Sequence, residues 1–240
     1  RTSIFLLLGA GVASSAREHS LPVLLIAAGI LGCISFVDDI RPLPAKFRFL
    51  IHGILAGVGI LAIGTPAWEL RFASLTIPMP AIQILAWVWI AGYTNAFNFM
   101  DGINGLAGGQ AVITGFGMAV IAAKLSGCWT NPEIILCLVI AGAAAGFLPH
   151  NFPRARMFMG DVGSASLGFL LSSLCVALVK HLGPGSIIPL VFLHLNFILD
   201  TSITLIRRIA RGDTWYSPHR EHFYQRLIRS GKSHTTVTLV

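Results

Sequence analysis

The chain has 240 residues, of which 55% are hydrophobic and only 11% are charged, and its formal net charge is +7. A soluble domain of average composition carries about 25% charged residues, so this chain lacks the side chains needed to cover a surface in water, and a soluble protein is excluded. The excess of positive charge is attributed to loops at the cytosolic surface of a membrane, and no nucleic acid is expected as a partner.

The long apolar runs predict the fold class. In a lipid bilayer only helices or a closed barrel satisfy the polar groups of the backbone, and apolar runs that do not alternate with polar residues favour helices. We therefore predict an all-α, polytopic integral membrane bundle with about eight membrane segments. The first run, Ile4 to Ala13, is too short to span a bilayer. The other expected spans are Leu21–Val37, Phe47–Ile63, Ile82–Phe97, Leu106–Lys124, Ile134–Pro149, Val162–Val179 and Ser186–Arg207.

Residues 1–240 are expected to form a single transmembrane domain that is truncated at both ends. The short first run suggests that an N-terminal helix and loop are missing, and no span follows Ser186–Arg207. The four cysteines show no CxxC spacing, so neither a disulfide nor a metal is inferred from them.

The distribution of lysine and arginine predicts the orientation. Successive loops alternate between the two sides of the membrane, and one side receives 13 of the 17 basic residues, Arg1 among them. The other side receives Arg17, Arg71, Lys124 and Lys180. Basic residues accumulate in cytosolic loops, so the first side is cytosolic and Gly64–Pro80 is an outer loop.

Four separate polar clusters fall on this cytosolic side. They are the pair Asp38-Asp39, the segment with Asn95, Asn98, Asp101 and Asn104, the loop between His150-Asn151 and Asp161, and the last loop with His219 and His222. If these polar residues had no shared role, the number of spans between them would not be expected to place all four clusters on the same side of the membrane. Their shared face predicts one polar site at the cytosolic surface.

Asp38 and Asp39 are adjacent carboxylates at the end of an inward-going span. Two carboxylates at a membrane surface repel each other, so a divalent cation, a basic side chain or a proton in transfer would stabilise them. The alternative is a solvated helix end in which Arg41 is the partner.

Asn98, Asp101 and Asn104 recur at every third position, among glycines at positions 102, 105, 108 and 109. Glycines let the backbone approach a ligand closely. Amides and a carboxylate suit sugar hydroxyls, a nucleobase edge or metal-bound water. The alternative is a capped helix start, which needs one such residue and not three.

Asp161 precedes a span in the stretch Phe158-Met-Gly-Asp-Val-Gly-Ser. A carboxylate at a helix N-terminus is stabilised in its charged form by the helix dipole, which suits a metal ligand and equally suits a simple helix cap. Phe158 beside it could stack on a base, although aromatic residues are common at membrane interfaces.

The last loop contains Arg220, Arg226 and Arg229, which suit phosphate binding; a patch for lipid headgroups is the alternative. His219 and His222 alone are a poor case for zinc. Asp200 lies inside a span, where a carboxylate is costly, and a structural or loop-positioning role is favoured for it.

Together these motifs resemble the polyprenyl-phosphate N-acetylhexosamine-1-phosphate transferases, the family of MraY and WecA (glycosyltransferase family 4). The matching stretches come in the family order and cover most of the chain. They are Phe36-Val-Asp-Asp-Ile, Asn95-Ala-Phe-Asn-Phe-Met-Asp-Gly-Ile-Asn-Gly-Leu-Ala, Asn151-Phe-Pro, Phe158-Met-Gly-Asp-Val-Gly-Ser, and Asp200-Thr with Arg207-Arg208.

The resemblance implies a reaction. A UDP-linked N-acetyl-sugar donates its sugar-1-phosphate to undecaprenyl phosphate and UMP is released, with Mg²⁺ required and Mn²⁺ as an alternative. The protein would be a multi-pass protein of the bacterial inner membrane with its site facing the cytoplasm, and a homodimer is left open. The predicted catalytic residues and metal ligands are Asp38, Asp39 and Asp161. The predicted substrate-binding residues are Asn98, Asp101, Asn104, Asn151, Phe158, Arg220 and His222.

One departure from the family pattern concerns the last loop. The branch similar to WecA often carries His-x-His-His there, whereas this chain reads His222-Phe-Tyr-Gln. The loop is closer to WbpL-type enzymes that initiate O-antigen or other surface polysaccharides, with N-acetylated fucose or quinovose donors besides other N-acetylhexosamines.

Three other functions are less consistent with the sequence. A transporter would fit intramembrane Asp200, but transporters place their polar groups near the midplane, whereas these lie at one surface. A CDP-alcohol phosphotransferase, the other membrane phosphotransferase considered, carries its aspartates in one helix segment, and here they are spread over three loops. A scaffold without chemistry would not need the carboxylates.

Overall fold

The computed structural model describes residues 2–66, 68–72, 75–214 and 220–239, and for residues 2–19, 72 and 75 it describes the backbone alone. The elements in chain order are α1 (Thr2–Ile40), α2 (Ala45–Ile63), β1 (Leu70–Phe72), β2 (Leu75–Ile77), α3 (Met79–Met100), α4 (Leu106–Ser126), α5 (Pro132–Asn151), α6 (Gly160–Leu182), η1 (Pro184–Ser186), α7 (Ile187–Phe192), α8 (Leu195–Ala210), α9 (Phe223–Arg229) and α10 (His234–Leu239).

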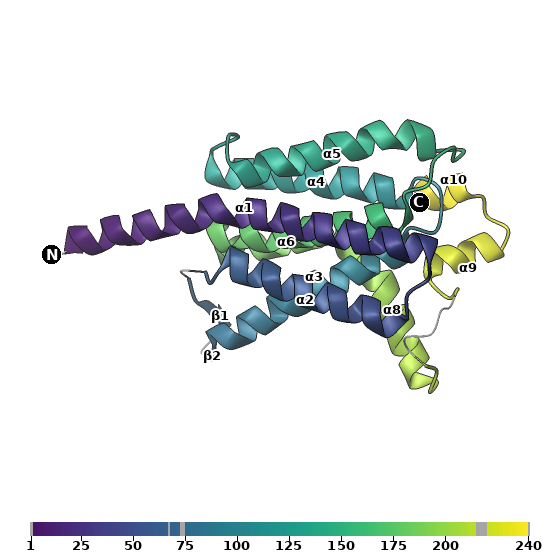
Figure 1. The fold of residues 1–240 in the computed structure, drawn as a ribbon, viewed down its shortest axis with the longest axis horizontal. Coiled ribbons are helices and arrows are strands. Elements are labelled where there is room, and N and C mark those ends of the chain that lie inside the picture. The colour runs from purple at the N-terminus through teal and green to yellow at the C-terminus, as the bar shows by residue number, and fades with distance from the viewer. Residues whose placement is uncertain (1, 67, 73–74, 215–219, 240) are drawn as a thin grey trace.

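Helix α6 occupies the centre of the bundle. It packs against α1 and α3 along much of its length and also contacts α2, α4 and α5. Figure 1 shows α4 and α5 as a layer on one side of α1 and α6, with α2 and α3 on the other side. The central place of α6 follows from its many small residues, because glycine, alanine and serine allow helices to approach closely in a membrane.

Two buried apolar clusters lie on opposite faces of α6. The larger one joins α3, α4, α5, α6 and α8 and includes Phe97, Met118 and Phe197, all fully buried. The smaller one joins α1, α2 and α6 through Leu24, Leu31 and other residues around Phe169. The other five long helices are therefore held by packing on α6.

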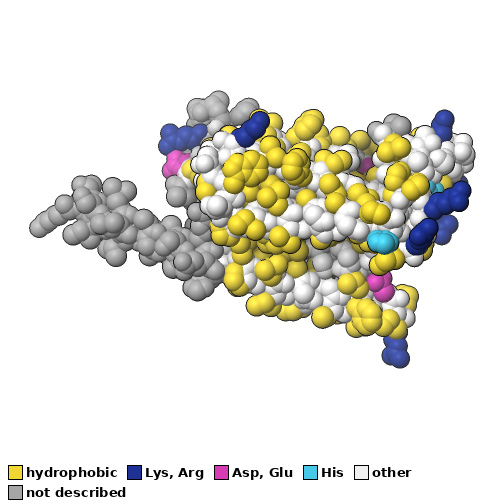
Figure 2. All heavy atoms as spheres, turned by 90° about the horizontal axis from the view of Figure 1, so that it is seen from above, with side chains coloured by type: hydrophobic (Ala, Val, Ile, Leu, Met, Phe, Trp, Pro, Cys, Tyr) yellow, Lys and Arg dark blue, Asp and Glu magenta, His cyan; other side chains and the backbone are white. Residues whose placement is uncertain are grey.

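The sides of the bundle are apolar and its two ends carry the charges. Figure 2 shows hydrophobic side chains along the sides, whereas Lys and Arg gather toward the ends. Large side chains such as Leu61 and Ile188 are 84% and 79% exposed, which is the pattern expected where lipid replaces water. The prediction of an all-α polytopic membrane protein is confirmed.

The expected number of about eight membrane segments is too high. By length and hydropathy, five helices in the described part of the chain can cross a membrane, and the bent pair around α7 and α8 would make a sixth. Helix α3 has 22 residues and is long enough. Gln83, Thr94 and Asn95 lower its mean hydropathy, so it falls outside that count.

The first two expected segments form one continuous helix, α1, which runs from Thr2 to Ile40 with Pro22 inside it. Figure 1 shows its N-terminal part projecting beyond the bundle on the side of β1 and β2. The N-terminal part of α1 therefore lies at the end of the bundle with β1 and β2, whereas the distribution of basic residues had placed the start of the chain on the cytosolic side. Arg1 lies outside the described residues.

The outer loop expected at Gly64–Pro80 contains a short antiparallel pair, β1 and β2, in which Leu70 pairs with Ile77. Apolar and polar residues alternate here over only a few positions, a signal that the long apolar runs on either side obscure. The indole Nε1 of Trp68 donates to the carbonyl of Lys180 at 2.9 Å, which ties this loop to the end of α6.

The last expected span, Ser186–Arg207, is broken. Helices η1–α7 and α8 meet at an angle of 75°. The carbonyl of Leu193 at the break accepts hydrogen bonds from Gln110 Nε2 at 2.7 Å and from Thr114 Oγ1 at 3.2 Å. These two side chains of α4 replace the helical hydrogen bond that the Leu193 carbonyl loses at the break. Such a replacement is needed because no water is available to a backbone carbonyl in an apolar surrounding.

Candidate functional site

One end of the bundle, here called the polar end, gathers the helix termini next to the polar motifs. These are the C-terminal ends of α1, α3 and α5, the N-terminal ends of α2, α4 and α6, and the short helices α9 and α10 (Figure 1). The predicted site residues at helix ends and in the intervening loops therefore meet at one face, as the helix parity in the sequence predicted.

Asp38 and Asp161 converge on a single cation at the polar end. Nη1 of Arg48, on α2, lies 3.0 Å from Oδ2 of Asp38 and 3.3 Å from Oδ2 of Asp161. Both residues line the same small cavity. Asp38 is buried, and its Oδ1 accepts a hydrogen bond from the N–H of Leu43 at 2.5 Å. The side chain of Asp161 is 31% exposed, so the pair is open to solvent on the side of α6.

Asp39 joins the end of α1 to the start of α6. Its Oδ1 accepts from the N–H of Asp161 at 3.1 Å and its Oδ2 from the N–H of Val162 at 3.4 Å. Asp39 is thus a helix cap supplied by another helix. Gly160 permits this approach, since its φ is +65° and a Cβ there would lie 2.9 Å from Oδ2 of Asp39.

Asn98 and Asp101 bring the end of α3 to the same place. Oδ1 of Asn98 accepts a hydrogen bond from Oγ of Ser164 on α6 at 2.6 Å, and Asn98 lines a small cavity together with Asp38, Arg48 and Asp161. Burial, followed by the nearby negative charges of Asp161 and Asp39, raises the pKa of Asp101 to about 6. The four aspartates predicted from three separate loops therefore form one cluster.

Asn104 and Asn151 bind the surrounding loops to one another. Nδ2 of Asn104 donates to the carbonyl of Pro153 at 3.1 Å. Asn151 is buried; its Oδ1 accepts from the N–H of Gly105 at 2.6 Å and its Nδ2 donates to the carbonyl of Met157 at 2.8 Å. In this structure both side chains hold backbone in place, and the substrate-binding role predicted for them stays a prediction.

Phe158 and Arg220 are exposed and His222 is buried. Phe158 is 79% exposed in the loop between α5 and α6, where its ring is accessible to a ligand. His222 is 4% exposed, and its Nδ1 lies 3.2 Å from Oδ1 of Asp200. Asp200 thus contacts the last loop, and the structural or loop-positioning role predicted for it stays a prediction. His219 lies outside the described residues.

Sequence reasoning missed three residues of this site. Arg48 was counted only as a cytosolic charge; in the structure it lies one turn inside α2. His52, one turn further, is 4% exposed and faces the same small cavity as Asp38 and Asp161. Tyr224 reaches the carbonyl of Phe99 with its hydroxyl at 2.9 Å. Their side-chain directions depend on tertiary packing, and no spacing in the sequence signals them.

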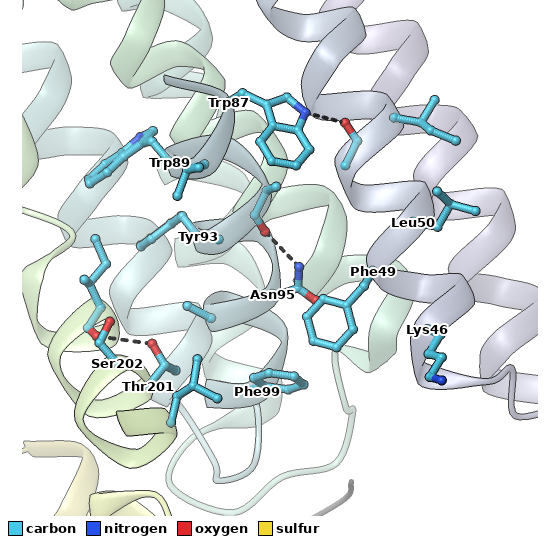
Figure 3. A pocket seen from close by; sticks show the side chains of 18 of the residues that line it. Lys46, Phe49, Leu50, Trp87, Trp89, Tyr93, Asn95, Phe99, Thr201 and Ser202 are labelled. Atoms are coloured by element: carbon cyan, nitrogen blue, oxygen red, sulfur yellow. Dashed lines mark hydrogen bonds between the residues drawn. The ribbon is translucent and has the colours of Figure 1, made fainter. Parts of the chain in front are cut away.

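A large apolar groove opens beside the acidic cluster, between α2, α3 and α8 (Figure 3). Its cavity volume is about 1060 Å³. Trp87, Leu50 and Phe49 line its walls, and Lys46 and His222 lie among the residues that line it. Lys46, Phe49 and Leu50 come from the same turns of α2 as Arg48, so the groove and the acidic cluster share one helix.

The residues present fit a divalent ion in part. Among the described residues no three His, Cys, Asp or Glu side chains form a ready metal site. Mg²⁺, however, is commonly held by one or two carboxylates together with waters and substrate phosphates. Asp38 and Asp161 supply two carboxylates that already share one cation, the guanidinium of Arg48. A dication bound with phosphates therefore suits this donor set.

Comparison with known proteins shows the family. Residues 21–179 match the family model described as glycosyl transferase family 4. A probable undecaprenyl-phosphate N-acetylglucosaminyl 1-phosphate transferase of Bacillus subtilis (strain 168) is 34% identical over 99% of this chain and 67% of its own length. A decaprenyl-phosphate N-acetylglucosaminephosphotransferase of Mycolicibacterium smegmatis is 28% identical over 92% of this chain and 59% of its own length. A phospho-N-acetylmuramoyl-pentapeptide-transferase of Staphylococcus epidermidis is 30% identical over 79% of this chain and 62% of its own length.

The chain belongs to glycosyl transferase family 4, as its motifs predicted. It spans 59 to 67% of the length of these three relatives. The matched residues 21–179 include the acidic cluster of α1, α3 and α6, whereas Asp200, Arg220 and His222 lie beyond them.

Proposed function

We propose that the full-length protein transfers a sugar-1-phosphate from a UDP-N-acetylhexosamine to undecaprenyl phosphate at the cytosolic face of the bacterial inner membrane. The observation that carries this proposal is the convergence of Asp38 and Asp161 on Arg48 at a bundle end that also opens into an apolar groove. The arrangement suits a reaction between a water-soluble donor and a membrane-bound acceptor. The Bacillus subtilis relative is named for an undecaprenyl-phosphate acceptor and the Mycolicibacterium smegmatis relative for a decaprenyl-phosphate acceptor, which supports a polyprenyl-phosphate acceptor here.

The reaction concentrates negative charge. An oxygen of the lipid phosphate bonds to the sugar-bearing phosphorus of the donor, the pyrophosphate P–O bond breaks, and UMP leaves with the bonding electrons. Cations must neutralise the phosphates as they approach each other. Arg48 supplies one fixed positive charge at the cluster. Mg²⁺, which we propose is held by Asp38 and Asp161 with Mn²⁺ as a substitute, would supply further charge neutralisation.

The aspartates of α1 have two tasks in this proposal. Asp38 faces the shared cation, and as a carboxylate it can accept the proton that a phosphate monoester still carries near neutral pH, since the second phosphate pKa is about 6. Asp39 holds the first turn of α6 through two backbone N–H groups and so fixes Asp161. An alternative sequence, in which an aspartate attacks the donor before the lipid arrives, would release UMP without any acceptor.

The groove is proposed as the site of the polyprenyl chain. Its walls are mostly apolar and come from α2, α3 and α8. Lys46 lies on the α2 side of the groove (Figure 3), and its positive charge is proposed to bind the lipid phosphate. The exposed ring of Phe158 and the end of α3 with Asn98 and Asp101 are proposed for the nucleotide-sugar, and Arg220 for its phosphates.

The proposal for the donor sugar and for the pathway rests on the last loop alone. Because His222-Phe-Tyr-Gln replaces His-x-His-His, we propose that the donor is UDP-GlcNAc or a UDP-linked FucNAc, QuiNAc or GalNAc, and that the product initiates O-antigen or another surface polysaccharide.

Transfer of radiolabelled sugar phosphate to undecaprenyl phosphate tests the proposal. The full-length protein in detergent is given each UDP-sugar with and without Mg²⁺, and lipid-linked label and UMP are measured. Label in lipid that requires both the acceptor and Mg²⁺ supports the proposal. Uptake of UDP-sugar into proteoliposomes without lipid-linked product would instead indicate the transporter alternative.

A further inference from the structure

Asp200, on α8, is buried and accepts hydrogen bonds from four groups. They are Nδ1 of His222 at 3.2 Å, the N–H of Phe223 at 2.9 Å, the N–H of Tyr224 at 3.3 Å and Oγ1 of Thr204 at 3.3 Å. Phe223 and Tyr224 are the first two residues of α9, and the first N–H groups of a helix have no partner within it. Asp200 therefore caps α9 from a different helix.

The same carboxylate fixes the ring of His222. Its Oδ1 lies 3.2 Å from Nδ1 of His222, and the His222 side chain also forms a capping box with Gln225 at the start of α9. These contacts hold the Nδ1 edge of the ring toward Asp200, so the opposite edge of the ring faces away from Asp200. The ring also lies parallel to that of Tyr224, with centroids 6.0 Å apart. His222 is one of the residues that line the apolar groove.

Helix α9 is joined in turn to the acidic cluster. The hydroxyl of Tyr224 donates to the carbonyl of Phe99 at 2.9 Å and fits over Gly102, where a Cβ would lie only 2.1 Å from the hydroxyl oxygen. Gly102 directly follows Asp101. Burial raises the pKa of Tyr224 to about 12, so its hydroxyl keeps the proton that it donates.

We propose that Asp200 is a positioning residue for phosphate transfer, which it serves by holding His222 toward the lipid phosphate at the groove. This inference rests on the proposed function. Asp200 touches neither substrate in this account; His222 does. Its contribution should therefore appear in the use of the lipid acceptor and should disappear when His222 is absent.

A double-mutant cycle in the full-length protein tests this. Asp200→Asn keeps the shape and an accepting oxygen but removes the charge that orients His222. We expect kcat/KM for undecaprenyl phosphate to fall by about 10- to 100-fold in Asp200→Asn, with the Kd for UDP-sugar unchanged within about twofold, and to fall no further when the change is added to His222→Ala. Asp200→Glu should restore part of the loss because it restores the charge.

Hydrogen exchange provides a readout that does not depend on turnover. In Asp200→Asn, faster exchange confined to residues 222–226 supports the proposal. An unfolded variant, or exchange that rises throughout α1 to α6, assigns Asp200 to the fold as a whole and overturns it. Multiplicative losses in the cycle, or equal losses of donor and acceptor affinity, overturn it as well.

The wild-type protein separates this inference from the proposed function. Absence of transfer by the wild type contradicts the proposed function itself. Transfer by the wild type together with an unaltered acceptor kcat/KM in Asp200→Asn leaves that function standing and contradicts the positioning role.

Discussion

The carboxylates at the polar end are of two kinds, which differ in their hydrogen-bond and ion-pair partners. Asp200 is buried and receives four hydrogen bonds from its own chain. Asp38 and Asp161, from α1 and α6, share one nitrogen of Arg48, and the side chain of Asp161 is 31% exposed. The first arrangement is complete without a ligand. The second depends on a shared cation, and a bound cation with phosphates can take that place.

The difference assigns different roles to residues that look alike in the sequence. A buried carboxylate surrounded by donors stabilises one conformation, because an unpaired buried charge is costly. Carboxylates that converge on one cation and remain open to solvent are suited to bind ions and phosphates. Substitutions at the two groups should therefore separate chemistry from positioning.

The largest effect is expected at Asp161. Asp161→Asn replaces a carboxylate by an amide, a poor Mg²⁺ ligand, and should lower kcat by about a thousandfold or more, equivalent to ~4 kcal/mol of transition-state stabilisation. Transfer of labelled sugar phosphate by the full-length protein measures this. Glu69→Gln, an exposed carboxylate paired with Arg71 at the other end, is the matched control and should keep wild-type activity. Activity of Asp161→Asn within tenfold of the wild type would remove it from the mechanism.

The next largest effect is expected at the pair on α1. Asp38→Asn and Asp39→Asn should each lower kcat by about 100-fold while changing the Kd for UDP-sugar by less than about threefold. Asp38 acts at the phosphates, and Asp39 holds the turn that carries Asp161. Steady-state kinetics and calorimetry measure the two quantities separately. If both variants lose donor affinity and keep kcat, the pair belongs to the donor site.

A smaller effect is expected in the groove. Gly92→Leu places an apolar side chain into it without a clash, because a Cβ at Gly92 meets no atom within 4 Å. The KM for undecaprenyl phosphate should rise by about tenfold, since a single filled position in an apolar pocket is worth 1–3 kcal/mol. Gly142→Leu on α5, where a Cβ also meets nothing within 4 Å, should leave this KM unchanged. Equal KM values in the two variants would place the lipid chain elsewhere.

The smallest effect is expected at Thr204, one of the four donors to Asp200. Thr204→Val keeps the shape and removes one hydrogen bond, so the free energy of unfolding should fall by about 1 kcal/mol. The change in kcat should stay within about twofold, because three donors remain. Thermal unfolding in detergent and transfer assays measure the two. A large loss of activity with unchanged stability would show that the hydroxyl itself takes part in the chemistry.

The sequence predicted the helices and the polar face because both depend on local patterns. Apolar runs placed a helix at six of the seven full-length spans, whereas the seventh is broken, and helix parity brought Asp38, Asp101 and Asp161 to one end. The break at Leu193 was not predictable in this way, since it is stabilised by Gln110 and Thr114 from a distant part of the chain. Nor was the fusion of the first two segments into α1, because the polar stretch around Arg17 resembles a loop.

The site was predicted as a set of carboxylates without the residues that organise it. Arg48 and His52 lie in an apolar helix, and no sequence pattern marks their positions as part of the site. They reach the site only because α2 packs beside α1 and α6. Asn151 was predicted to bind substrate from its motif, and the structure shows that its amide joins two loops. Residue type and spacing therefore predicted which carboxylates lie together, whereas their hydrogen-bond partners could be identified only from the fold.

Binding of Mn²⁺, measured by electron paramagnetic resonance, distinguishes the two kinds of carboxylate. Asp38 and Asp161 are proposed to form the ion and phosphate site, whereas Asp200 is proposed only to position its neighbours. With UDP-GlcNAc present, the full-length wild type and Asp200→Asn should bind Mn²⁺ with the same affinity, and Asp161→Asn should lose it. Equal Mn²⁺ affinity in Asp161→Asn and the wild type, or loss confined to Asp200→Asn, would contradict the account.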